Sequence, residues 1–269
     1  MKIPALSLQK PERQGRAPSG VRSERKAGPP GPAQRARKGE ESLRLPRNYK
    51  ELLDSGHKCD QDFRIVSGNL EWLDGCLVTA PHGGGIEPGT SEIALATANI
   101  SRRAFYVFEG MRKSGNRQLH IDSTGFDEPE FLKLAPLCEF VLSVHGANGE
   151  AEKTIYVGGL YERGKTLLID QLNADLSVVG IAAVDAAGVS GGEGIAGLSR
   201  QNLTNRGVRR QGVQLEFSEG ARRVFFPDLD SREGREHPSP HLALLTASVE
   251  RAIAQLVVKN RTDKGRAPS

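Results

Sequence analysis

Short apolar runs separated by glycine-rich and polar segments recur along the chain between residues 63 and 217. Apolar runs bounded by turn residues are typical of buried strands, whereas apolar positions three or four residues apart favour helices. Strands are predicted at 63–66, 77–80, 104–108, 119–121, 140–144, 155–157, 181–184 and 213–217. Helices are predicted from Tyr49 up to Gly56 and at 91–100, 131–137, 161–175 and 239–259.

The predicted strands alternate with helical stretches, which is the pattern of an α/β protein. Crossovers through helices favour parallel strands with helices on both faces of the sheet. We therefore expect a single domain with an open, mixed, mostly parallel sheet flanked by helices on both faces. In such sheets ligands bind beyond the carboxyl ends of the strands. Polar residues that follow a buried strand are thus the first candidates for a functional site.

Charge is unevenly distributed over the 269 residues, whose formal net charge is +4. Residues 1–48 hold 12 Lys and Arg against 4 Asp and Glu, so the rest of the chain is mildly acidic. The N-terminal part is also rich in Pro, Gly and Ser, a composition that favours disorder. We predict a disordered basic N-terminal extension at 1–47, a folded domain at 48–260 and a flexible C-terminal tail at 261–269. Nucleic acid is expected as a partner only through the basic extension.

The three cysteines, Cys59, Cys76 and Cys138, lie far apart and form no CxxC pair. Neither a disulfide framework nor a Cys-rich zinc site is therefore indicated. No run approaches the length of about 18 apolar residues that a spanning helix requires, and the N-terminus lacks the apolar core of a secretory signal. We expect no membrane association and, by default, a cytoplasmic location. The sequence carries no indication of the oligomeric state.

The segment APHGGGIEPGTSE links the predicted strand at 77–80 to the predicted helix at 91–100. It places His82 and Glu87 around three consecutive glycines, which allow the backbone to reverse tightly. The two side chains can therefore converge at the end of the strand, as in a metal site or an anion site. A phosphate-binding loop or a plain structural turn are the alternatives. The phosphate loop is disfavoured because neither the GxxxxGK[ST] nor the GxGxxG spacing is present.

A second histidine, His145, directly follows the predicted strand at 140–144 and precedes a glycine. Two histidines at the same edge of one sheet, together with Glu87, form a set suited to zinc. Three protein ligands leave the fourth position of a catalytic zinc open to water, whereas a structural zinc takes four. A lone histidine is more often a satisfied core or loop residue, but the repeated arrangement favours a metal site. We expect one Zn²⁺ per chain, bound by His82, Glu87 and His145.

The predicted strand at 213–217 alternates so that Glu216 faces away from its apolar neighbours. A carboxylate in an apolar strand is costly unless it is paired or used. We predict that Glu216 is the general base that takes a proton from a metal-activated water. A structural glutamate paired with Arg222 or Arg223 is the alternative.

Five segments of the chain resemble, in order, the poly-γ-glutamate hydrolase family, a group of phage and bacterial zinc peptidases. These segments are HGGGIEPGTSEIA, FEGMRKSGNRQLHIDST, SVHG, YVGG and GVQLEFS. Members of the family resemble zinc carboxypeptidases, with an open mixed α/β sheet and one zinc ion. The resemblance implies His82, Glu87 and His145 as zinc ligands and Glu216 as the base, so the domain at 48–260 is expected to be a zinc hydrolase domain.

The resemblance further implies an endo-acting zinc metallopeptidase that cleaves the γ-glutamyl amide bonds of poly-γ-glutamate. Each unit of this polymer carries a free carboxylate, which basic side chains, and arginine above all, recognise. Candidate substrate-binding cations in loops are Arg112, Lys113, Arg206 and Arg209, although each is also consistent with simple surface solvation. Residues expected to line the substrate cleft are His120, Ser123 and Thr124. His120 is equally well a core residue or one that supports a ligand.

Two other functions stay open at this point. The first keeps the zinc and changes the substrate, giving an amidase or deacylase for small acylated amino acids. The second is a non-catalytic, nucleic-acid-associated protein that uses the basic extension. Because the folded part is acidic, it offers no overall attraction to a polyanion such as poly-γ-glutamate. The sequence therefore distinguishes poorly between a poly-γ-glutamate hydrolase and the amidase or deacylase. Release by lysis is one route by which a protein without a secretory signal would reach an extracellular polymer.

Overall fold

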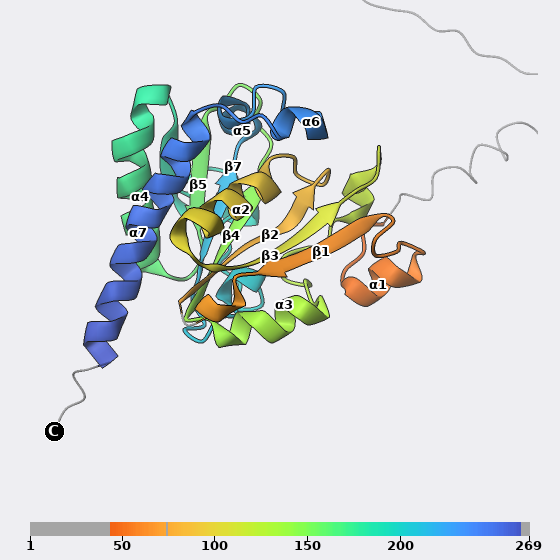
Figure 1. The fold of residues 1–269 in the computed structure, drawn as a ribbon, viewed down its shortest axis with the longest axis horizontal. Coiled ribbons are helices and arrows are strands. Elements are labelled where there is room, and N and C mark those ends of the chain that lie inside the picture. The colour runs from red at the N-terminus through yellow and green to blue at the C-terminus, as the bar shows by residue number, and fades with distance from the viewer. Residues whose placement is uncertain (1–43, 74, 265–269) are drawn as a thin grey trace, which may run out of the picture. The chain divides into compact units, whose positions relative to one another are not determined.

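The structure is a computed structural model that describes residues 44–73 and 75–264. Its centre is a seven-stranded sheet with the strand order β1-β3-β2-β4-β7-β5-β6 (Figure 1). The strands are β1 (Phe63–Gly68), β2 (Cys76–Gly84), β3 (Ala104–Gly110), β4 (Phe140–Gly146), β5 (Thr154–Gly158), β6 (Ala182–Asp185) and β7 (Val213–Phe217).

The four central strands, β3, β2, β4 and β7, run parallel to one another. The outer strands β1 and β5 pair antiparallel with β3 and β7, and β6 pairs parallel with β5. The expected fold class, an open, mixed, mostly parallel sheet, is thereby confirmed. Because the four central strands share one direction, their carboxyl ends meet at one edge of the sheet.

Helices cover both faces of the sheet because the apolar side chains of the buried strands alternate between two cores. Along β2, Cys76 and Val78 belong to one hydrophobic cluster and Leu77 belongs to the other. The helices are α1 (Tyr49–Asp54), α2 (Thr90–Ser101), α3 (Pro129–Leu134), α4 (Glu162–Leu176), α5 (Glu219–Phe225), α6 (Arg232–Arg235) and α7 (His241–Lys264). Figure 1 shows α4 and α7 side by side, and these two helices pack with α2 on the first core. Residues of α1 and α3 contribute to the second core.

The structure differs from the sequence prediction at one strand and two helices. The predicted strand at 119–121 is wrong, since Asn116–Leu119 form a 3-10 helix, η4, that starts after Gly115 in the left-handed region. A run of three residues is too short to distinguish a strand from a helical turn by its pattern. The short helices α5 and α6 were not predicted. In addition, β2 continues past the predicted end through His82 to Gly84, with an irregular register between Ala80 and Gly83.

Disorder was predicted for residues 1–47. Of these, only 44–47 lie within the described residues. At the other end, α7 continues to Lys264, and the remainder of the predicted tail lies outside the described residues. The domain boundaries therefore stay predictions. Within the described part of the chain, no helix has the length and apolar character needed to cross a membrane.

Candidate metal centre

The parallel strands bring three of the predicted functional residues to one edge of the sheet. His82 lies near the carboxyl end of β2, and His145 and Glu216 lie near the ends of β4 and β7. His145 and Glu216 are register partners on adjacent strands. All three residues are buried, with exposed fractions of 2%, 2% and 6%. Three segments far apart in the sequence thus form one site because of the strand order.

The glycine segment folds Glu87 back over the end of β2. Gly84 has a φ of +63°, and a Cβ atom there would lie 2.4 Å from the carbonyl oxygen of Gly110. Only glycine therefore allows β2 and β3 to approach so closely at this turn. The Glu87 amide donates to the carbonyl of His82 at 2.9 Å, which closes the turn. The Gly146 amide, next to His145, donates to Oε2 of Glu87 at 2.8 Å and orients its carboxylate.

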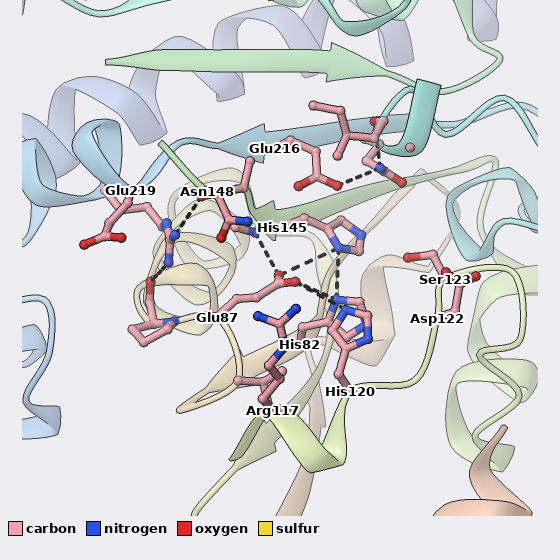
Figure 2. Close-up of a pocket in the computed structure, with 18 of the residues that line it drawn as sticks. His82, Glu87, Arg117, His120, Asp122, Ser123, His145, Asn148, Glu216 and Glu219 are labelled. Atoms are coloured by element: carbon pink, nitrogen blue, oxygen red, sulfur yellow. Dashed lines mark hydrogen bonds and ion pairs between the residues drawn. The ribbon is translucent and has the colours of Figure 1, made fainter. Parts of the chain in front are cut away.

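Nitrogen and oxygen atoms of three side chains converge at this turn (Figure 2). Nδ1 of His82 lies 3.1 Å from Oε1 of Glu87 and 3.2 Å from Nδ1 of His145. Nδ1 of His145 lies 3.9 Å from Oε2 of Glu87. Nε2 of His82 donates to the carbonyl of Ile121 at 2.7 Å, so Nδ1 of a neutral His82 ring carries the lone pair that faces the cluster.

His120 adds a third imidazole to the cluster. Its ring stacks on that of His82 with centroids 3.8 Å apart, and its Nε2 lies 3.6 Å from Oε1 of Glu87. By the mutual distances of their ligand atoms, His82, Glu87 and His120 could hold a metal ion. The sequence prediction places His145 in this set instead of His120, and the structure has both rings beside Glu87. His120 is half-exposed, whereas His145 is buried.

The electrostatics of the cluster favour positive charge beside Glu87. Burial disfavours the charged form of His82, but Glu87, the Ile121 carbonyl and Asp122 together raise the pKa of this ring. Burial likewise opposes ionisation of Glu87, but the surrounding histidines lower its pKa. Burial, together with His82, lowers the pKa of His145 to about 3, so this ring is neutral near pH 7. One cation, either a proton or a metal ion, can balance the negative charge of Glu87 within this cluster.

Glu216 is held by an amide, and no arginine of the described residues makes a hydrogen bond or ion pair with it. Nε2 of Gln214 donates to Oε1 of Glu216 at 2.9 Å, and Gln214 in turn accepts a hydrogen bond from Asn202 at 3.1 Å. Burial and the nearby Glu87 raise the pKa of Glu216 well above its ordinary value. Within the described residues, no ion pair joins Glu216 to Arg222.

The two arginines proposed as partners of Glu216 make other contacts. Arg222 is buried and donates to the backbone carbonyls of Phe217, Pro88 and Ala147 at 3.2, 2.8 and 3.0 Å. Arg223 pairs with Glu219 and Asp230. The three carbonyls bonded by Arg222 belong to the segments that follow His82, His145 and Glu216. Arg222 therefore ties together the segments that carry the cluster and the candidate base.

A cavity of about 510 Å³ opens over the cluster. Its lining includes His82, Glu87, His145 and Glu216, together with three residues predicted to line a substrate cleft, namely His120, Ser123 and Thr124. The four predicted substrate-binding cations are not among its lining residues: Arg112, Lys113, Arg206 and Arg209.

Three of those four cations have structural contacts. Arg112 donates to Gln118 at 3.0 Å. Arg206 donates to the carbonyls of Gln201, Phe126 and Thr124. Arg209 pairs with Glu139 at 2.9 Å and lies over the ring of Tyr161. Lys113 is exposed. A role for these four residues in substrate binding stays a prediction.

The sequence reasoning missed several polar residues of the lining: Arg117, Asp122, Asn148, Asn202 and Gln214. Gln214 could have been found from the strand alternation, because it shares a face with Glu216. Arg117 had no such signal, because it lies two residues before the predicted strand at 119–121 and no helical turn was predicted there. Figure 2 shows its guanidinium on the same side of the cavity as His120.

These features define an α/β protein with a candidate metal centre at the carboxyl edge of its parallel strands and a buried carboxylate beside it. The sequence model of the poly-gamma-glutamate hydrolase family matches residues 47–247, and the chain belongs to this family. The resemblance read from the sequence motifs is thereby confirmed, and family membership indicates a hydrolase.

Relatives with known sequences occur in Bacillus subtilis (strain 168). The UPF0714 protein YmaC is 34% identical over 181 residues, which are 67% of this chain and 72% of that protein. The SPbeta prophage-derived UPF0714 protein YoqZ is 35% identical over 210 residues, or 77% of this chain and 72% of that protein.

Two solved structures share the fold. A bacteriophage poly-gamma-glutamate hydrolase superposes with a TM-score of 0.71 at 27% identity and covers 78% of this chain and 96% of its own. The zinc-free apo structure of YndL superposes with a TM-score of 0.67 at 31% identity and covers 77% of this chain and 96% of its own. The phage structure relates this chain to phage proteins, as the motifs predicted.

Proposed function

We propose that this protein is a zinc metallopeptidase that cleaves the γ-glutamyl amide bonds of poly-γ-glutamate. Three observations support the proposal: the family membership, the fold shared with a phage poly-gamma-glutamate hydrolase, and a relative whose structure is described as zinc-free. The observation that carries it is local. A histidine–carboxylate cluster faces the same cavity as Glu216, which is buried and makes no ion pair with an arginine of the described residues.

The donor set of the cluster fits a zinc ion. Two nitrogens that each lie 2.0–2.1 Å from a tetrahedral zinc are roughly 3.3 Å apart, close to the 3.2 Å between the Nδ1 atoms of His82 and His145. The outward nitrogen of His82 already donates to a carbonyl, as is usual for a metal-binding histidine. We assign His82, Glu87 and His145 as the residues that would hold one zinc ion, with His120 beside them.

A zinc ion held there would supply Lewis acidity, which polarises the scissile carbonyl and makes water acidic enough to attack near neutral pH. Glu216 would take the proton of the attacking water and then pass it to the leaving nitrogen. Gln214 holds Oε1 of Glu216, and within the described residues no hydrogen bond engages Oε2. The Oε2 atom is therefore the one we assign to the proton transfer.

The test is the chain length of poly-γ-glutamate after incubation with zinc-loaded protein. We expect the polymer to shorten with the wild type and to keep its length with Glu216→Gln, which preserves the shape of the side chain and removes its basicity. Unchanged polymer length with the wild type at full zinc occupancy would overturn the substrate assignment. Hydrolysis of small acylated amino acids by the same sample would then favour the amidase alternative.

A further inference from the structure

The cavity needs a cation for an anionic substrate, and one arginine among its described lining residues is free to provide it. The carboxylates that line the cavity are Glu87, Asp122, Glu216, Glu219 and Asp230, against two arginines, Arg117 and Arg222. Arg222 is buried and bonded to three backbone carbonyls. Arg117 is exposed, and within the described residues its side chain has no hydrogen bond or ion pair.

The backbone under Arg117 is firmly anchored although its side chain is free. The buried Asn116 accepts from the amide of Arg112 at 2.9 Å and donates to the carbonyl of Arg112 at 2.7 Å. Cβ atoms added at Gly85 or Gly110 would lie 2.3 and 2.7 Å from the Asn116 side chain. Asn116 therefore packs directly against the ends of β2 and β3, and it fixes η4 at the rim of the cluster.

The geometry of η4 directs Arg117 toward the site. Side chains three residues apart lie on the same side of a 3-10 helix. Arg117 therefore shares a side with His120, whose amide donates to the Arg117 carbonyl at 3.2 Å and whose ring stacks on His82. Figure 2 shows the Arg117 guanidinium unpaired and directed toward the cluster.

The chemistry of a γ-linked chain provides a partner for this guanidinium. In such a chain the carbon attached to each amide nitrogen carries a free carboxylate, so a carboxylate lies two bonds from every scissile nitrogen. In an α-linked chain that position is an amide carbonyl, and the free carboxylate lies at the far end of the side chain. A planar guanidinium beside the site can form a bidentate hydrogen-bonded pair with the carboxylate of the γ-linked chain. The side-chain carboxylate of the α-linked chain lies too far from the scissile nitrogen to occupy the same position.

We propose that Arg117 binds the free carboxylate next to the scissile nitrogen and thereby selects γ-linked over α-linked glutamate chains. This inference rests on the proposed function and deepens it, since it names the residue that distinguishes the γ-linkage from the α-linkage. The role is one of substrate recognition, separate from zinc binding and proton transfer.

The test compares γ-linked with α-linked tetraglutamate, two ligands with the same composition and net charge. Binding is measured by calorimetry on the zinc-loaded Glu216→Gln protein, which leaves the ligand intact, with and without Arg117→Gln. We expect the loss of Arg117 to weaken γ-linked tetraglutamate by about tenfold to a hundredfold, the range for a charged hydrogen-bonded pair. Binding of the α-linked ligand should change by less than twofold.

Two further variants sharpen the result. Arg117→Lys keeps the charge without the planar fork, so it should restore part of the affinity but not the full preference for the γ-linkage. Lys133→Gln removes the same charge from an exposed position of α3 that does not line the cavity, and it should leave both affinities unchanged. With Glu216 intact, Arg117→Gln should raise KM for the polymer and leave kcat nearly constant.

If Arg117→Gln weakened the binding of both tetraglutamates equally, the inference would be overturned, because Arg117 would then attract any anion rather than distinguish the two linkages. Unchanged binding of the γ-linked ligand would overturn it as well, while the proposed hydrolase would survive if the polymer is still cleaved. If the zinc-loaded protein without the Arg117 substitution binds neither tetraglutamate and the wild type does not shorten the polymer, the proposed function fails and the inference fails with it.

Discussion

Two walls of the cavity hold their functional side chains in different ways. The strand wall consists of His82, Glu87, His145 and Glu216 at the carboxyl ends of the central strands. The η4 wall consists of residues 116–124 beside them. Side chains of the strand wall are buried or nearly so, and backbone amides, carbonyls or amide side chains fix all of them except His145. On the η4 wall Arg117 is exposed, and 30% of the His120 side chain is accessible.

The difference separates two tasks that an enzyme site must perform. Buried groups with fixed partners keep the geometry that metal binding and proton transfer require, because each alternative position would leave a polar atom unpaired. Exposed groups on an anchored backbone can bind and release a charged substrate at low cost. We therefore expect substitutions in the strand wall to remove the reaction and those in the η4 wall to change substrate binding.

The largest effect is expected from His145→Ala. If His145 is one of three ligands, as proposed, its removal should lower the zinc content from about one ion per chain to nearly none, and activity should fall with it. Elemental analysis of the purified protein measures this directly. His120→Ala is the matched control from the η4 wall and should keep most of the zinc. The opposite pattern, with zinc lost in His120→Ala and kept in His145→Ala, would make His120 the third ligand.

Glu216→Gln should rank second, with a fall in kcat of about 10²- to 10⁴-fold and unchanged zinc content, because it removes a proton acceptor and no ligand. Steady-state hydrolysis of the polymer and elemental analysis on the same sample check both parts. Glu219→Gln is the control, since Glu219 also lines the cavity but pairs with Arg223. Wild-type kcat in Glu216→Gln would exclude this residue as the base.

The sequence predicted the strand wall much better than the η4 wall, for a physical reason. His82, His145 and Glu216 lie at the ends of buried strands, and the parallel arrangement brings such ends together whatever the details of the turns. Recognition of His120 and Arg117 as neighbours required the conformation of 116–119. This segment, NRQL, has a single apolar residue, so its pattern distinguishes neither a strand nor a 3-10 helix.

The contacts of Arg222 were also beyond prediction. The short sequence separation between Arg222 and Glu216 suggested an ion pair. The guanidinium instead donates to one nearby carbonyl, that of Phe217, and to carbonyls of two distant loops. Three-dimensional proximity of Pro88 and Ala147 to Arg222 depends on the whole strand order. Sequence spacing alone carries no such information.

Arg222→Lys should produce an intermediate effect, because an ammonium cannot bond three carbonyls in the geometry of the guanidinium fork. Loosening of the segments after His82 and His145 should weaken zinc binding by about tenfold to a hundredfold, as loss of a supporting contact typically does. Competition with a chelator measures the affinity. Arg223→Lys, on the same helix but paired with Glu219 and Asp230, should leave it unchanged. Equal zinc affinity of Arg222→Lys and the wild type would show that the strand wall holds its geometry without Arg222.

The smallest effect is expected from Arg206→Ala, which tests whether the η4 wall depends on an anchor at its far end. Arg206 donates to the carbonyls of Thr124 and Phe126, and to that of Gln201 on its own loop. Its loss should lower the free energy of unfolding by about 1 kcal/mol, the usual net contribution of such hydrogen bonds, and leave KM for the polymer within twofold. Chemical denaturation and steady-state kinetics give the two values. A tenfold rise in KM without a change in stability would instead make Arg206 a substrate-binding residue, as the sequence suggested, and would extend the recognition surface beyond the cavity.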